Sequence, residues 1–155
     1  MTILRQLGAA VLGVLLLAGA AACTSTHPTA PARPPSSTAS RPAADVARWW
    51  ISGTVSDDWK QLGTDTTAVS SAEQAADTQS VTWACAALKA DAAAFQVKDL
   101  PAPDAVLDQL LAQSATLMVR SADACLAGNQ AEADALAEQA ATAIDAVTER
   151  VRVLP

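Results

Sequence analysis

Residues 81–95 read VTWACAALKADAAAF, and this stretch decides the fold. Its larger apolar residues recur every three or four positions, which is the spacing of one helix face. The residues on that face are Val81, Cys85, Leu88, Ala92 and Phe95. The apolar positions before Ala76 fall on the opposite face, so we expect a new helix to begin at Asp77 or Thr78, with one of them as its N-cap.

One helix is expected before this stretch. Apolar residues recur at helical spacing from Ile51 to Val69, which predicts a single long helix over about Asp45–Gln74. Gly53 and Gly63 weaken it, since glycine is a poor helix former.

Two helices are expected after it. Pro101 and Pro103 end the second helix, and Asp104 suits the start of a third, whose apolar face ends at Cys125. Gly128 is a typical C-terminal cap. Asn129 followed by Glu132 then resembles a capping box before the last helix. That helix ends with Arg150 and Arg152, which favour the negative end of a helix dipole.

The fold class that we expect is all-α. It is an antiparallel four-helix bundle over residues 45–155, with one inter-helix disulfide between Cys85 and Cys125. The two cysteines reach the same level only if Val97–Pro103 is an extended segment that climbs along the bundle. Trp49 and Trp50 should then cover the start of the third helix at Val106, Leu107 and Leu110.

The N-terminus has the pattern of an export signal. Arg5 precedes an uninterrupted run of apolar residues and Gly over residues 7–22, which ends in three alanines before Cys23. Sixteen residues are shorter than the roughly 20 that a membrane-spanning helix needs. We therefore expect residues 1–22 to be a signal peptide, with an uncleaved anchor as the alternative.

Cys23 resembles the lipidated cysteine of a bacterial lipobox, although that motif prefers a larger aliphatic residue where Ala20 stands. Three cysteines leave one odd thiol in an exported protein. Lipidation of Cys23 would consume it and leave Cys85 and Cys125 to pair. The alternative is ordinary signal cleavage, after which Cys23 stays a free thiol.

Residues 23–44 are expected to form a disordered linker after the lipid-bearing cysteine. They contain five Pro and eight Ser/Thr and no large apolar residue, so they cannot bury enough surface to fold. Fully extended, the linker would reach roughly 65 Å. His27, the only histidine, lies in it, so nothing would fix that side chain for catalysis.

The charge of the folded part argues against nucleic acid as a partner. From Asp45 onward there are seven Lys/Arg and sixteen Asp/Glu, a net charge of −9. Such a domain repels phosphate backbones and anionic lipid surfaces.

The sequence offers no catalytic residues and no cofactor site. Without a histidine after His27, Ser-His and Cys-His catalysis and Glu-x-x-His di-iron sites are excluded, and zinc is excluded if the two cysteines are bonded. No Gly-rich phosphate loop occurs. Carboxylate pairs remain as an alternative that could bind a hard cation: Asp134 with Glu138, Asp104 with Asp108, and Asp57 with Asp58. We interpret them as a solvated acidic face, and Asp91 is the carboxylate closest to an apolar stripe.

Trp50 and Trp83 mark a possible binding surface. Trp83 forms a second stripe with Ala87, Ala90 and Ala94, opposite the stripe of Cys85. This stripe is either a partner-binding face or a second buried side of the helix, and core packing is the default for every tryptophan.

Several of these features occur together: the signal ending at Cys23, the Pro/Ser/Thr stalk, Trp49-Trp50, Cys85 with Leu88, Pro101–Asp104, and Cys125 with Gly128. In combination they resemble the small Ala-rich helical lipoproteins of high-GC Gram-positive bacteria. The resemblance implies a cellular location and a fold but no activity.

We therefore expect a non-enzymatic lipoprotein on the extracytoplasmic face of the cell membrane, held there by its N-terminal lipid. It would bind an envelope protein or an apolar ligand. The alternative is a carboxylate-dependent hydrolase or metal-binding protein.

Overall fold

The structure, a computed structural model, describes residues 41–154. The expected signal peptide, Cys23 and linker residues 24–40 with His27 lie outside the described residues. The last four residues of the expected linker, 41–44, belong to a helix instead. The folded part therefore begins earlier than the sequence predicted.

The described part of the chain is all-helical, with no strand and with five helices. They are α1 (Arg41–Ser52), α2 (Val55–Gln74), α3 (Thr78–Lys98), α4 (Ala105–Leu126) and α5 (Gln130–Arg152).

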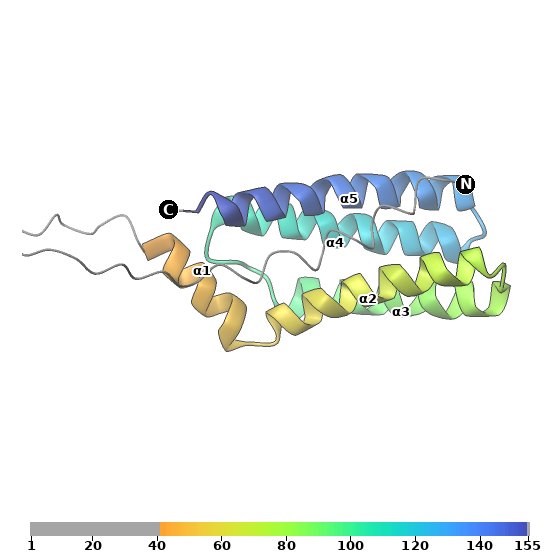
Figure 1. Ribbon diagram of the computed structural model, residues 1–155, viewed down its shortest axis with the longest axis horizontal. Helices are drawn as coiled ribbons and strands as arrows, with labels where there is room; N and C mark the ends of the chain where they lie inside the picture. Colours follow the sequence, from red (N-terminus) through yellow and green to blue (C-terminus); the bar gives the residue numbers. More distant parts are fainter. Residues whose placement is uncertain (1–40, 155) are drawn as a thin grey trace, which may run out of the picture.

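The prediction of one long first helix was wrong, because the chain breaks at Gly53 and Thr54. Gly53 favours a break, since glycine lacks a Cβ and costs a helix entropy. The Thr54 carbonyl accepts the backbone N–H groups of Asp57 and Asp58, and its hydroxyl donates to Asp99 at 3.4 Å. Thr54 is thus tied to the connection after α3, which turns α1 away from the axis of α2 (Figure 1). Gly63 stays inside α2.

The predicted N-caps of α3 and α4 are confirmed. The Asp77 carboxylate accepts the backbone N–H groups of Gln79 and Ser80, and Asp104 accepts that of Leu107. Gly128 takes a left-handed conformation with φ 74° directly after the C-cap of α4. The predicted capping box at Asn129 was wrong. The Asn129 side chain donates to the Glu132 carboxylate and makes no hydrogen bond that caps α5.

The helices pack in chain order, α2 on α3, α3 on α4 and α4 on α5. In Figure 1, α2 and α3 lie along one side of the molecule and α4 and α5 along the other. Ala-rich helix faces supply much of the core, because small side chains let the helix backbones approach closely. The largest fully buried residues are Leu62, Phe95, Leu107 and Leu111, with Cys85 and Ser114 beside them.

A disulfide joins α3 to α4. The Sγ atoms of Cys85 and Cys125 are 2.03 Å apart and their Cα atoms 6.4 Å apart, so the predicted bond is confirmed. The connection over residues 99–104 runs outward from the end of α3 to the start of α4, which extends beyond α3 (Figure 1). This is the expected climb, although α3 continues to Lys98 and the climb begins two residues later than predicted.

The tryptophans of α1 pack differently from the prediction. The ring of Trp50 lies 6.4 Å from that of Trp59, which lies 5.4 Å from Phe95, so this aromatic chain leads into α2 and α3. Val106, which the tryptophans were expected to cover, is 51% exposed. The break at Gly53 is the physical reason, since it reorients α1.

Candidate functional site

The outer face of α3 is the most unusual surface of the described residues. Trp83 is 71% exposed there, in the second turn of a regular helix. An arc of about 120° around the helix contains only apolar side chains over roughly 21 Å. All of them are exposed, and they are Trp83, Ala86, Ala87, Ala90, Ala93, Ala94 and Val97. We call this set the α3 outer face.

The inner face of α3 is also apolar and buried. Cys85, Leu88, Ala92 and Phe95 point into the core between α2 and α4. A helix with apolar residues on all sides is normally covered on all sides. Among the described helices, however, α3 packs on α2 and α4. The stripe of Trp83, Ala87, Ala90 and Ala94 is exposed, so core packing, the default expected for the tryptophans, was wrong for Trp83. Ala86, Ala93 and Val97 were missed, although their helical spacing could have revealed them.

Trp50, the other predicted surface residue, is half-buried. It stacks against Trp49 at 6.0 Å and Trp59 at 6.4 Å and belongs to the edge of the core. The structure therefore places Trp50 and Trp83 on different elements and does not bring them into one site.

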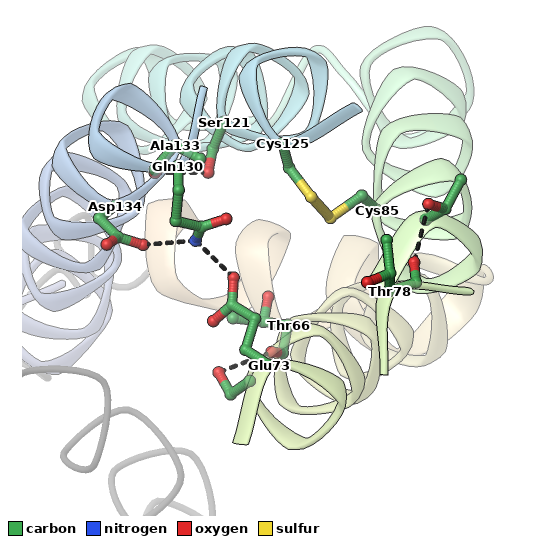
Figure 2. Close-up of a disulfide and its surroundings, with 11 residues drawn as sticks. Thr66, Glu73, Thr78, Cys85, Ser121, Cys125, Gln130, Ala133 and Asp134 are labelled. Atoms are coloured by element: carbon green, nitrogen blue, oxygen red, sulfur yellow. Dashed lines mark hydrogen bonds between the residues drawn. A yellow bond between two sulfur atoms is a disulfide. The ribbon is translucent and has the colours of Figure 1, made fainter. Parts of the chain in front are cut away.

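Two small hollows lie between the helices near the disulfide. Figure 2 shows the Cys85–Cys125 bond beside Gln130, whose side-chain amide donates to Glu73 at 2.6 Å and to Asp134 at 2.9 Å. Each hollow has a volume of about 30 Å³ and an almost entirely apolar lining from α2, α3, α4 and α5. A space of that size matches a single water molecule and is far below the several hundred Å³ of a ligand pocket.

Asp65 on α2 and Asp91 on α3 bring two carboxyls together inside the helix packing. Asp65 is only 6% exposed, and its Oδ1 accepts a hydrogen bond from Gln61 at 2.9 Å. Its buried Oδ2 has no hydrogen-bond partner among the described residues. Burial and the neighbouring Asp91 raise the pKa of Asp65 to about 6, since two carboxylates in one apolar site cannot both stay ionised cheaply. Asp91 was singled out from the sequence, whereas its partner was not.

A second carboxyl pair lies where α2 begins and α3 ends. Lys98 donates to the Asp58 carboxylate at 2.8 Å and lowers the pKa of Asp58. Asp99 is buried beside it, and burial together with Asp58 raises the pKa of Asp99. Within the pair, Asp99 therefore holds a proton more tightly than Asp58, and the Thr54 hydroxyl donates to Asp99.

Asp104 and Arg150 join the start of α4 to the end of α5. The Arg150 Nε donates to the Asp104 carboxylate at 2.9 Å and its Nη2 donates to the other oxygen. This two-pronged contact lowers the pKa of Asp104 to about 2. The sequence indicated Asp104 as a cap and Arg150 as a dipole partner, and the contact between them was missed.

The carboxylate pairs considered from the sequence have other hydrogen-bond partners. Asp108 accepts the Ala102 N–H at 2.8 Å, Asp57 pairs with Lys60 at 3.2 Å, and Asp134 accepts from Gln130. Within residues 41–154, no group of three or more His, Cys, Asp or Glu is arranged to hold a metal ion. The same residues include no helix that is both long and apolar enough to span a bilayer.

Comparisons with models of known protein families, with curated proteins and with solved structures gave no significant match. The α3 outer face is therefore the candidate site on physical grounds alone.

Proposed function

We propose that the protein is a non-enzymatic binding module of the cell envelope, anchored through Cys23 to the extracytoplasmic face of the membrane. Its binding surface is the α3 outer face, and its partner is an apolar helical segment of another envelope protein. The observation that carries this proposal is the exposure of Trp83, 71%, within an uncharged arc of α3. Exposed apolar surface on a small domain is typical of interaction sites.

The chemistry of the face favours a helix as the partner. Four or more alanines in the middle of the face allow a second helix to approach closely, as small residues do at helix packing interfaces. Trp83 and Val97 lie at the two ends of the face and would contact that helix on either side of the alanines. Tryptophan is the residue type most often found to dominate binding energy.

The helix packing and the disulfide favour a rigid binding surface. We infer that α2 to α5 make up the antiparallel four-helix bundle expected from the sequence, with α1 appended. The Cys85–Cys125 bond fixes α3 to α4 two residues from Trp83, so the face needs little ordering when it binds. A disulfide also suits an oxidising compartment outside the cytoplasm.

The alternative, a carboxylate-dependent hydrolase or metal-binding protein, has less support. The two carboxyl pairs that converge, Asp65 with Asp91 and Asp58 with Asp99, lie at contacts between α2 and the end or the body of α3. Neither lines one of the two hollows, which are in any case too small for a substrate.

The proposal is tested by photo-crosslinking in the cells that produce the protein. A photoreactive amino acid is placed at Ala90, in the middle of the face, and in a control chain at Glu138, an exposed position on α5. We expect a discrete protein adduct from position 90 only, and Trp83→Asp should weaken it at least 30-fold, as loss of about 2 kcal/mol implies.

Trp83→Asp should leave the thermal midpoint unchanged, because the side chain is mostly exposed. An adduct that forms equally at both positions, or that survives Trp83→Asp, would contradict the proposed surface. An adduct to a second copy of the chain would overturn the proposed partner and show that the face mediates self-association.

A further inference from the structure

Most of the exposed large apolar residues lie at one end of the molecule. Of the seven that the described residues include, five are in α1, at the end of α3, at the start of α4 and at the end of α5, namely Ile51, Val97, Val106, Val151 and Val153. Trp83 and Leu126 are the other two. We call this end, formed by residues 41–54, 97–106 and 150–154, the tether end.

Contacts between chain segments show that these residues form one end. Thr54 reaches Asp99, and Arg150 binds Asp104, so the start of α2, the α3–α4 connection and the end of α5 are joined. Figure 1 shows α1, the start of α4 and the end of α5 at the same end of the molecule.

The charges divide unequally between the two halves of the helices. The half away from the tether end has seven carboxylates against Arg120 and Lys89, which pairs with Asp123, a net charge of −5. The half at the tether end has nine carboxylates against six Lys/Arg including Arg41, a net charge of −3. An anionic surface therefore repels the far half more strongly and orients the tether end toward itself.

The chain also enters the fold at this end. Cys23 precedes Arg41 by eighteen residues, which can span at most about 60 Å. A lipid on Cys23 would therefore keep the tether end within reach of the bilayer. Trp49 and Trp50 are half-buried here, and tryptophan favours the level of the lipid headgroups.

We propose that the tether end lies on the membrane surface, with Ile51, Val106 and Val153 at the headgroups and the more acidic half turned away. This inference rests on the proposed anchor at Cys23. It leaves the far part of the α3 outer face, with Trp83, accessible to a partner.

The test uses the full chain with its native N-terminal modification in vesicles of phosphatidylcholine and phosphatidylglycerol with brominated acyl chains. Bromine quenches tryptophan fluorescence over a short range. Trp83→Phe should leave the quenching unchanged, whereas Trp49→Phe with Trp50→Phe should remove at least half of it. Ile51→Asp with Val153→Asp should also at least halve the quenching, while the matched exposed control at the other end, Leu126→Asp, should not.

Flotation of the vesicles separates the two proposals. A protein that floats with the vesicles but is not quenched, or is quenched mainly through Trp83, overturns the orientation and leaves the anchor standing. A protein that does not float overturns both. An equal effect of the Ile51/Val153 and Leu126 substitutions also contradicts the inference, since then no end is preferred.

Discussion

Replacing Asp65 with asparagine should stabilise the protein at neutral pH. The carboxyl is buried between α2 and α3 beside Asp91, with one oxygen bound by Gln61 and the other without a described partner. Asparagine has the same shape, so its oxygen can accept from Gln61 and its amide can donate to Asp91. The substitution removes the like charge and keeps the geometry.

The pKa gives the magnitude and its sign. Asp65 has a pKa of about 6 in the folded protein against 3.8 as a model value, so the folded state binds the proton more tightly. The stability from this group is fully present below pH 3.8 and is lost as the pH rises through about 6. Two pKa units correspond to at most about 3 kcal/mol. Because asparagine is itself a buried polar group, we expect a gain of about 1–2 kcal/mol at pH 7.

The assay is urea unfolding at pH 4, 5, 6 and 7 with the disulfide intact. The difference in unfolding free energy between Asp65→Asn and wild type should grow between pH 4 and pH 6 and then stay constant. The exposed Asp145→Asn serves as control and should show no such change. A difference that is flat with pH, or a variant less stable than wild type at pH 7, would refute the raised pKa of Asp65.

Three other predictions follow from single contacts. Asp104→Ala should lower the free energy of unfolding by about 2 kcal/mol, because it removes the α4 cap and the Arg150 contact. In wild type, urea unfolding should show that this contribution is lost as the pH falls from 3.8 to about 2. Ala76→Gly should stabilise the protein by about 0.5–1 kcal/mol in thermal unfolding, because Ala76 has φ 53°, which glycine adopts without strain; a destabilised variant would show that the turn has another conformation. Trp83→Phe should remove the component of tryptophan fluorescence most accessible to acrylamide, whereas Trp59→Phe should not, and equal effects would place Trp83 in the core.

Helical periodicity predicted much of the fold. The caps at Asp77 and Asp104 and the glycine after α4, Gly128, followed from local chemistry, which acts within a few residues. The disulfide followed from the count of cysteines and from their places on the apolar helix faces. The break at Gly53 did not follow, because a glycine is tolerated inside a helix, as Gly63 is in α2. The difference depends on the bond from Thr54 to Asp99, which is 45 residues away.

The candidate site was predicted in part for the same reason. The exposure of the Trp83 stripe depends on which neighbours cover α3, and periodicity alone left both outcomes open. The Asp65–Asp91 and Asp104–Arg150 contacts join residues far apart in sequence on consecutive helices, so no spacing rule indicated them. Trp50 packs with Trp59 because α1 turns at the break.

The most direct test of the account is mass spectrometry of the protein isolated from the envelope of its own cells, alkylated without reduction and then digested. We predict an N-terminal peptide that begins with a lipid-modified Cys23 and a cross-linked pair of peptides with Cys85 joined to Cys125. Alkylated Cys85 and Cys125 would contradict the packing of α3 on α4 and the export that the function requires. An unmodified Cys23 with an intact disulfide would contradict the anchor alone.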